Sequence, residues 1–510
     1  MAQLQISNLD FTYEGSSDPV FEDLSVMIDT SWKLGLIGRN GKGKTTLLRL
    51  LMGCYEYRGS IQRPTEFDYF PYEVRPEDLE KTAAELAERW KPAVEFWQIS
   101  VQMNLIGMDQ ECLFRPFGTL SHGERTRVML AVLFADENEF LLIDEPTNHL
   151  DSSAREIVKN YLAGKKGFLL VSHDRDLLDA VVDHVLVLNR KTVEVQAGNF
   201  TSWWENKEKN DAFALAENEK HKREIKKLHA AAERSAGWAE KNESTKIGFD
   251  PVKEPERNIS TRSYIGAKTK KMQSRVKSFE NRIEREIEEK EGLLSDIEQV
   301  KDLKIEPLSH HKELLIHADR MTLDYGESSP IVCNLSFEVR RGERVVLAGA
   351  NGSGKSSIIA AILAAAGAGM EDEVRACPNV CGTLETASGM VISYVNQDTS
   401  FLKGVLRAFC RERKLSESTL FAVLRHLDFE RTQFGKDMRE FSEGQKKKVL
   451  VAASLITPAH LYIWDEPLNF IDVFSRMQIE KMIKNFEPTM LLVEHDVRFR
   501  EEVATKIVNL

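Results

Sequence analysis

The sequence predicts an α/β protein in which two similar domains are joined by a long α-helical segment. Four short motifs occur twice in the same order, and about 100 residues lie between the two sets. A length of 510 residues agrees with this organisation, because domains usually contain roughly 100–200 residues. Apolar residues make up 42% and charged residues 29% of the chain, so several cores can form and wholesale disorder is not expected.

The repeated motifs define the two outer domains. Ser121 and Asp144 lie 23 residues apart, and Ser442 and Asp465 have the same spacing. Four motifs that recur in register indicate a duplicated domain. We expect domains at 1–204 and 313–510, with a linker at 205–312. The motif pairs are GRNGKGKTT (38–46) and GANGSGKSS (349–357), TLSHGERTR (119–127) and EFSEGQKKK (440–448), FLLIDEPTNHLD (140–151) and LYIWDEPLNFID (461–472), and LLVSHD (169–174) and LLVEHD (491–496).

The linker is predicted to be an antiparallel helical hairpin. Apolar residues recur in steps of three and four from Met272 onward, and with looser helical spacing over 206–234. Glycines and prolines in 242–266 require the chain to turn there. The irregular tip of the hairpin is therefore expected at about 241–264.

Composition excludes several classes of protein. No run of 18 or more apolar residues is present, so no transmembrane helix is expected. The N-terminal residues lack the basic and apolar regions of a secretion signal. Six cysteines in this length indicate a reducing cytosol, and the single CPNVC pair, Cys377 and Cys381, is not expected to bind metal.

The GxxxxGK[ST] motifs predict two nucleotide phosphate loops. Each motif follows an apolar, strand-like run and precedes a helical run, which is the context such a loop requires. The lysines would reach the β- and γ-phosphates, and the hydroxyls of Thr45 and Ser356 would contact Mg²⁺. The residues expected at the phosphates are Gly38, Asn40, Gly41, Gly43, Lys44, Thr45 and Thr46 in the first loop, and Gly349, Asn351, Gly352, Gly354, Lys355, Ser356 and Ser357 in the second.

Carboxylates and histidines follow further strand-like runs. An aspartate at the end of a buried strand can hold Mg²⁺, and the glutamate after it can polarise the attacking water; a surface salt bridge is the alternative. A histidine at the end of the next strand could sense the γ-phosphate, with a structural role as the alternative. The predicted metal residues are Asp144 and Asp465, and the predicted catalytic residues are Glu145, Glu466, His173 and His495.

These motifs together resemble those of ATP-binding cassettes. LSHGE and FSEGQ resemble the family's signature loop, which implies that two cassettes face head to tail and enclose two ATP and two Mg²⁺. Signature residues Ser442, Gly444 and Gln445 would then close the site of Lys44, and Ser121, Gly123 and Glu124 would close the site of Lys355. The resemblance implies that Tyr13 and Tyr325 stack on adenine, although packing in the core is the alternative. It also implies that Gln397 joins the Mg²⁺ shell, whereas Tyr72 stands at that place in the first domain and suggests unequal sites.

Within that family the whole chain resembles the ABC-F proteins. EPTNHLD is common in that branch, and EPLNFID resembles its antibiotic-resistance subgroup, the Lsa/Vga/Sal-like ribosome protection proteins. The resemblance implies a cytoplasmic, ribosome-associated monomer with intramolecular cassette pairing and no membrane partner. Its expected partners at the ribosomal E site are 23S rRNA, P-site tRNA and the L1 and 5S regions. It would displace lincosamides, streptogramin A and pleuromutilins; a housekeeping translation factor and the tandem ATPase subunit of an importer are the alternatives.

Charge along the chain supports an RNA-facing linker. The net charge of −11 speaks against nucleic acid, but residues 206–290 carry 21 Lys and Arg against 16 Asp and Glu, so that segment is net +5 and the rest −16. Cations there could hold phosphates and aromatic rings could stack on bases, although a solvated hairpin is the alternative. The residues expected to face rRNA or tRNA are Trp238, Lys246, Phe249, Lys253, Arg257, Arg262, Tyr264, Lys268, Lys270, Lys271 and Arg275.

Overall fold

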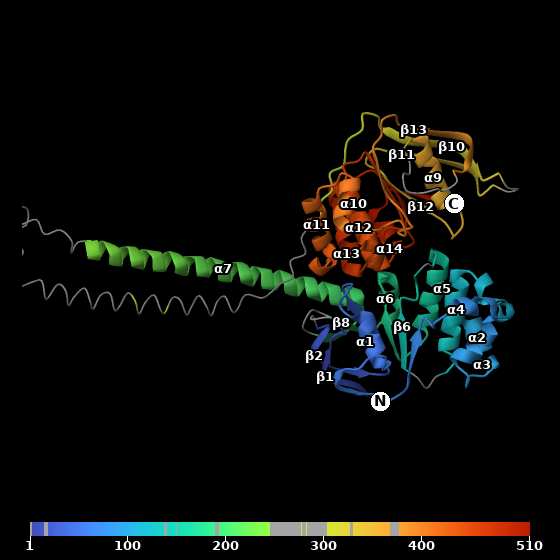
Figure 1. Ribbon diagram of the computed structural model, residues 1–510, viewed down its shortest axis with the longest axis horizontal. Coiled ribbons are helices and arrows are strands. Elements are labelled where there is room, and N and C mark those ends of the chain that lie inside the picture. Colours follow the sequence, from blue (N-terminus) through green and yellow to red (C-terminus); the bar gives the residue numbers. More distant parts are fainter. Residues whose placement is uncertain are drawn as a thin grey trace, which may run out of the picture. The chain divides into compact units, whose positions relative to one another are not determined.

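A computed structural model describes residues 3–14, 19–136, 140–148, 150–188, 193–244, 277, 282, 303–326, 330–367 and 377–510 (Figure 1). The chain divides into two compact units. One unit combines Met1–Trp203 with Lys301–Leu510, so it contains both copies of the repeat, and the other is Trp204–Val300.

The first domain combines a mostly parallel sheet with a small antiparallel sheet. In its described residues the larger sheet has the strand order β5-β6-β7-β3-β8-β9, in which β9 alone runs antiparallel, and the smaller has the order β2-β1-β4. The strands are β1 (Gln3–Phe11), β2 (Phe21–Asp29), β3 (Lys33–Gly38), β4 (Arg58–Gln62), β5 (Phe67–Phe70), β6 (Phe140–Asp144), β7 (Phe168–Val171), β8 (His184–Leu188) and β9 (Val193–Ala197). The helices are α1 (Lys44–Leu51), α2 (Ala83–Trp90), α3 (Phe96–Leu105), α4 (His122–Leu133), α5 (Ser152–Ala163) and α6 (Arg175–Val181), with 3₁₀ turns at Pro76–Glu80, Gln110–Phe114 and Phe117–Thr119.

The second domain repeats this arrangement. Its described strands form a parallel sheet of order β14-β15-β16-β12-β17 and an antiparallel sheet of order β11-β10-β13. The strands are β10 (Leu314–Asp324), β11 (Val332–Arg340), β12 (Arg344–Ala348), β13 (Asn379–Thr386), β14 (Ile392–Val395), β15 (Leu461–Asp465), β16 (Met490–Val493) and β17 (Lys506–Asn509). The helices are α9 (Lys355–Ala365), α10 (Leu406–Glu412), α11 (Glu417–His426), α12 (Glu443–Ile456), α13 (Val473–Phe486) and α14 (Val497–Val503), with 3₁₀ turns at Arg431–Gly435 and Met438–Glu440.

Continuous apolar runs explain why the central strands lie inside each domain. All four residues of β7 and of β16 are buried, as are the first four residues of β6 and all five of β15. Parallel strands covered on both faces have this composition. The predicted α/β fold with two repeated domains is therefore confirmed.

The parallel order places the functional motifs at one edge of each sheet. Strands β3, β6 and β7 are neighbours, and their carboxyl ends lead into the phosphate loop, Glu145 and His173. Strands β12, β15 and β16 do the same in the second domain. In open α/β sheets, ligands bind at this carboxyl edge.

The segment after the first domain forms one long helix, α7 (Phe200–Ser244), which extends over 45 residues (Figure 1). The looser helical spacing at 206–234 falls within it. Lys277 and Arg282 are also helical. The predicted tip and most of the second hairpin helix lie outside the described residues, so the hairpin stays a prediction.

The chain joins the core of the second domain ahead of the expected boundary at 313. Leu303 and Ile305 are each 2% exposed and pack in the core cluster that contains Trp464. The Tyr462 hydroxyl also donates to the Glu306 carbonyl at 3.4 Å. By packing, residues from about 301 therefore belong to this unit.

Across the described ranges, no helix combines the length and the apolar character that a membrane crossing requires.

Candidate nucleotide sites

A glycine stands at the end of each phosphate loop, directly before the helix, and any other residue there would be strained. Gly43 and Gly354 have φ of 88° and 91°, in the left-handed region, directly before α1 and α9. A Cβ on Gly43 would lie 2.7 Å from Val20, and one on Gly354 would lie 2.5 Å from Val332. Both loops therefore keep their backbone close to the neighbouring strand, with helix N–H groups directed at the loop.

The loop lysines are buried and turn toward their own loops. Lys44 Nζ donates to the Gly38 carbonyl at 2.6 Å. Lys355 Nζ donates to the carbonyls of Gly349 and Ala350 at 2.9 and 2.7 Å. Burial lowers the pKa of both lysines from the usual value, opposed by nearby carboxylates. A γ-phosphate would provide each ammonium group with the anionic partner that its buried position favours.

A hydroxyl and a carboxylate meet in each domain, as expected for a magnesium site. The distance from Thr45 Oγ1 to Asp144 Oδ2 is 2.9 Å, and that from Ser356 Oγ to Asp465 Oδ2 is also 2.9 Å. Hard oxygen ligands of this kind, with phosphate oxygens and waters, are the set that Mg²⁺ prefers. The residues present therefore fit a magnesium ion bound to a nucleotide.

The glutamates after these aspartates each lie against the predicted histidine. Glu145 Oε1 is 3.3 Å from His173 Nε2, and Glu466 Oε1 is 3.4 Å from His495 Nε2. Both glutamates adopt positive φ, 53° and 49°, although neither is a glycine. Backbone strain of this kind gathers at functional sites, where surrounding contacts hold it. The duplicated geometry supports a shared role for the pair.

The protonation of the two glutamates differs. Burial and the neighbouring Asp144 raise the pKa of Glu145 to about 8. Burial acts in the same direction on Glu466, but hydrogen bonds from His495 and Gln397 outweigh it and lower its pKa to about 2. The carboxylate of Glu466 is thus fixed as an anion, whereas that of Glu145 holds a proton near neutral pH.

The position of Gln397 explains part of this difference. Gln397 contacts Glu466, but Tyr72, its equivalent in the first domain, bonds Asp68 and stacks on Trp90 at 4.8 Å. The expected departure at Tyr72 is therefore visible in the structure. Sequence reasoning missed Tyr69, whose hydroxyl donates to Asp144 Oδ2 at 3.1 Å. Its place on β5, which pairs with β6, was the available signal.

The two candidate adenine-stacking tyrosines lie at equivalent places beside their loops. The Tyr13 hydroxyl is 2.7 Å from Thr46 Oγ1, and the Tyr325 hydroxyl donates to Ser357 Oγ at 3.1 Å. Tyr13 and Tyr325 are 41% and 42% exposed, so neither tyrosine is a core residue. An exposed ring next to a phosphate loop is available to stack on a base.

The signature serines cap the helices that follow them. Ser121 Oγ accepts from the Glu124 N–H, and the Glu124 carboxylate accepts from the Ser121 N–H at 2.7 Å. Ser442 and Gln445 form the same capping box at α12. The side chains of Glu124 and Gln445 therefore serve the helix start, and the exposed serines and the helix N-termini remain the groups that could meet a phosphate.

Contacts join each phosphate loop to the other domain. Asn40 Nδ2 donates to the Phe470 carbonyl at 2.9 Å, and a Cβ on Gly444 would lie 3.2 Å from the same amide nitrogen. In the other direction, the Asn351 backbone N–H donates to the Asp151 carboxylate. The first loop therefore lies beside the second signature motif, as in a head-to-tail arrangement. Gly123 packs within its own domain, with Leu150 and Ala154 3.7 Å from its ideal Cβ.

Ion pairs also connect the two domains. Arg175 pairs with Glu480, and both side chains are less than 10% exposed. Arg498 Nη1 donates to Asp179 Oδ2 at 2.9 Å. Sequence reasoning missed these pairs because their members lie outside the repeated motifs.

The predicted RNA-facing side chains lie outside the residues that the structure describes. Trp238 is within α7, but its side chain is not among those described. The others fall in 245–276, beyond the described residues.

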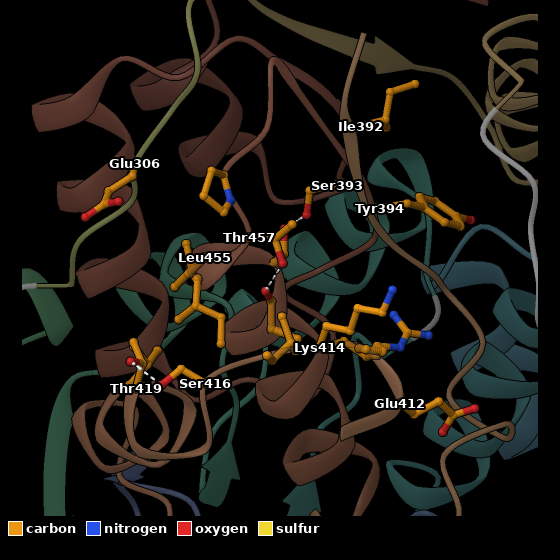
Figure 2. A pocket seen from close by; sticks show the side chains of 18 of the residues that line it. Glu306, Ile392, Ser393, Tyr394, Glu412, Lys414, Ser416, Thr419, Leu455 and Thr457 are labelled. Atoms are coloured by element: carbon orange, nitrogen blue, oxygen red, sulfur yellow. Dashed lines mark hydrogen bonds between the residues drawn. The ribbon is translucent and has the colours of Figure 1, made fainter. Parts of the chain in front are cut away.

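A cavity of about 1180 Å³ lies in the second domain, between the β14 residues Ser393 and Tyr394 and a helical layer that contributes Ser416 and Thr419 (Figure 2). Among the described residues, no cluster of three or more His, Cys, Asp or Glu could hold a metal ion.

Comparison with known proteins agrees with this geometry. The family model described as ABC transporter matches residues 21–148 and 332–469, which together exceed half of the chain. The ribosome protection protein VmlR of Bacillus subtilis is 26% identical over 96% of this chain and 84% of its own length. The energy-dependent translational throttle protein EttA of Haemophilus influenzae is 25% identical over 96% of this chain and 89% of its own.

A solved structure shares the α/β fold described above. It is the archaeal ribosome recycling factor aABCE1 in complex with the archaeal ribosomal stalk protein aP1, with a TM-score of 0.59 and 19% identity, covering 98% of this chain and 87% of that one. Full-length similarity to VmlR and EttA supports the ABC-F resemblance at about 25% identity without singling out its resistance subgroup. The family match and the two nucleotide sites together show that this chain belongs to the ABC transporter family and is an ATP-binding, Mg²⁺-using ATPase with two cassettes.

Proposed function

We propose that this ATPase is an ABC-F protein that protects ribosomes from antibiotics that bind at the peptidyl-transferase centre. The observation that supports the proposal most is similarity along nearly the whole chain, linker included, to a protein named for ribosome protection. The two cassettes and the long helix α7 give the chain the parts that such an action requires.

Under this proposal ATP acts as a conformational switch. Two ATP molecules, each with Mg²⁺, bind between the phosphate loop of one cassette and the signature motif of the other. The contacts of Asn40 with Phe470 and of Asn351 with Asp151 support this pairing. ATP favours the closed pair because it binds that state more tightly, and hydrolysis returns the pair to the open state.

Hydrolysis depends on groups that this chain supplies. Glu145 and Glu466 orient the attacking water, and His173 and His495 lie against their carboxyl groups. When bound, Mg²⁺ neutralises charge on the β- and γ-phosphates. Lys44 binds the phosphates of the first site.

The linker carries the action to the ribosome. In the closed state the cassettes fix the angle of the linker at the E site, and its tip at about 241–264 extends toward the peptidyl-transferase centre. There it shifts the tRNA acceptor end or rRNA bases, so that a bound lincosamide, streptogramin A or pleuromutilin is released. The net charge of +5 over 206–290 favours contact with RNA phosphates.

Drug susceptibility tests this proposal. Expression in a sensitive bacterium should raise the inhibitory concentrations of the three drug classes, and replacement of 242–266 by a short Gly/Ser turn should abolish that effect. The purified tip variant should keep wild-type ATPase activity, which serves as the control for folding. Unchanged protection by the tip variant would contradict the assigned role of the linker.

A housekeeping translation factor is the second candidate, because EttA is about as similar as VmlR. In that case expression would leave all three inhibitory concentrations unchanged, although the protein would still bind ribosomes. The tandem ATPase subunit of an importer is a third candidate and predicts co-purification with a membrane protein and no ribosome association.

A further inference from the structure

A buried lysine in the second signature helix contacts the loop that carries Gln397. Lys447 lies in α12 and is 3% exposed. Its Nζ donates to the backbone carbonyl of Asn396 at 2.9 Å. Asn396 directly precedes Gln397, so Lys447 restrains the backbone from which the Gln397 side chain extends.

This contact continues to the candidate catalytic carboxylate. The Gln397 side chain donates to Glu466, which also accepts from Asn469 Nδ2 at 2.6 Å. A second contact reinforces the attachment of the loop, because Glu443, one turn before Lys447, accepts from Thr399. Two contacts from one face of α12 therefore hold the loop at 396–399.

Nearby carboxylates offset part of the cost of burying the lysine. A buried cation is costly unless carboxylates lie close to it. Four carboxylates attract Lys447: those of Asp465, Glu466, Glu494 and Glu443.

The first domain has neither the buried lysine nor the carboxylate that corresponds to Glu494. Thr126 occupies the position of Lys447, and Ser172 occupies that of Glu494. The cation and one of its counter-charges are therefore present together in the second domain and absent together from the first. Tyr72, at the position of Gln397, bonds Asp68 instead of the catalytic carboxylate.

The same helix also faces the other nucleotide site. Ser442 caps α12, and a Cβ on Gly444 in its first turn would lie 3.2 Å from Asn40 Nδ2 of the first phosphate loop. A displacement of α12 at the site of Lys44 would therefore be transmitted through Lys447 to the loop of the second site.

We propose that Lys447 is a positioning residue for ATP hydrolysis at Glu466, and that it holds Asn396 and Gln397 so that Gln397 keeps the carboxylate directed at the attacking water. The inference rests on the ATP sites of the proposed function and not on its ribosomal part. The reaction itself is unchanged: the water oxygen bonds the γ-phosphorus, the bond from that phosphorus to the bridging oxygen breaks, ADP and inorganic phosphate leave, and one proton of the water passes to solvent. Since the first domain has Thr126, the two sites differ in their dependence on this helix.

Single-turnover hydrolysis with enzyme in excess tests the role of Lys447. A Glu145→Gln background reports turnover at Glu466, and a Glu466→Gln background reports turnover at Glu145. In the first background, Lys447→Met should slow the chemical step about 10- to 100-fold, the usual effect of removing a residue that positions a metal-site group. The half-saturating ATP concentration should change less than about twofold, because positioning acts on the transition state more than on binding.

The background and the conservative variant separate positioning from a general structural role. In the Glu466→Gln background, Lys447→Met should leave turnover within about twofold, since the first site does not use this contact. Lys447→Arg keeps a buried cationic donor and should restore most of the rate in the Glu145→Gln background. Lys403→Met, which removes an exposed lysine of the same cassette, should change neither rate.

Three results for Lys447→Met would overturn the inference. Hydrolysis could slow equally in both backgrounds, the half-saturating ATP concentration could change while the rate of the chemical step does not, or the rate in the Glu145→Gln background could stay at its original value. Should Lys447→Met fail to fold, Lys447→Gln takes its place in the same comparison. A different result would count against the ATP sites themselves: neither glutamate substitution alone would slow hydrolysis.

Discussion

A buried ion pair in the second cassette makes the structure testable by a stability measurement. Asp472 is fully buried and caps α13, where it accepts from the Ser475 N–H and hydroxyl, each at 3.0 Å. It also accepts from Lys448 Nζ at 2.6 Å, and Lys448 is 2% exposed. Asp472→Ala removes the helix cap and leaves the ammonium group buried without its counter-charge.

The expected cost is the sum of two effects. Loss of an N-cap side chain costs about 1 kcal/mol of unfolding free energy. Removal of one partner of a buried ion pair costs about 3–5 kcal/mol, because the other charge remains desolvated. Lys448 keeps one bond, to the Leu427 carbonyl at 2.7 Å, so the lower half of this range applies. We expect Asp472→Ala to lose about 4–5 kcal/mol.

The first cassette provides the matched control. Asp151 caps α5 in the same way, through the Ala154 N–H at 2.9 Å. Arg127, at the position of Lys448, donates to the Gly123 carbonyl instead. Asp151→Ala should lose the cap and the bonds from the Ser153 hydroxyl and the Asn351 N–H, but it leaves no buried lysine without its counter-charge, so the cost should be about 1–2 kcal/mol.

Urea denaturation without nucleotide, followed by tryptophan fluorescence, measures both costs. Adding Lys448→Met to Asp472→Ala should recover stability, because the unpaired charge is then gone. Equal losses for the two alanine variants, or no recovery in the double variant, would refute the assignment of a buried pair.

Three further predictions concern the nucleotide sites. The raised pKa of Glu145, about 8, means that the native state keeps a proton that the unfolded state releases near pH 4.5, so wild-type stability falls as pH rises between these values. In thermal melts without nucleotide, the advantage of Glu145→Gln over wild type should therefore grow from pH 5 to pH 8 by about 1 kcal/mol per pH unit, whereas the cost of Glu466→Gln should stay constant. Tyr69→Phe removes one of the two hydroxyl bonds to Asp144 Oδ2, which also accepts from Thr45, and should lower the half-saturating Mg²⁺ concentration for hydrolysis about fivefold, equivalent to about 1 kcal/mol. Tyr394→Phe, whose hydroxyl bonds Asn396 instead, should leave this concentration unchanged. Chelation of Mg²⁺ by excess EDTA should stop hydrolysis, and an assay of phosphate release with and without EDTA measures this.

Repetition is the reason that much of the fold could be predicted from the sequence. A motif that occurs twice with equal spacing fixed the strands before Lys44 and Lys355 and the helices after them. The same register brought Thr45 to Asp144 and Ser356 to Asp465, because neighbouring parallel strands end at one edge of the sheet.

Residues without a repeated partner could not be predicted in this way. Tyr69 lies on β5 and its hydroxyl donates to Asp144 at the end of the neighbouring strand β6, so its role follows only from the pairing of these two strands. Lys447 stands in a run of three lysines, and a lysine in such a run is normally a solvated residue. Its burial depends on tertiary packing of α12 against the loop at Asn396, which no local pattern encodes.

The central claim is that ATP binding by the two cassettes holds this protein on the ribosome and that hydrolysis releases it. Co-sedimentation with ribosomes through a sucrose cushion in the presence of ATP measures this directly for wild type and for Glu145→Gln combined with Glu466→Gln. The account predicts that the double variant binds ATP, hydrolyses it slowly and pellets with ribosomes, whereas wild type dissociates. A double variant that turns over ATP normally, or that stays in the supernatant with ATP bound, would contradict it.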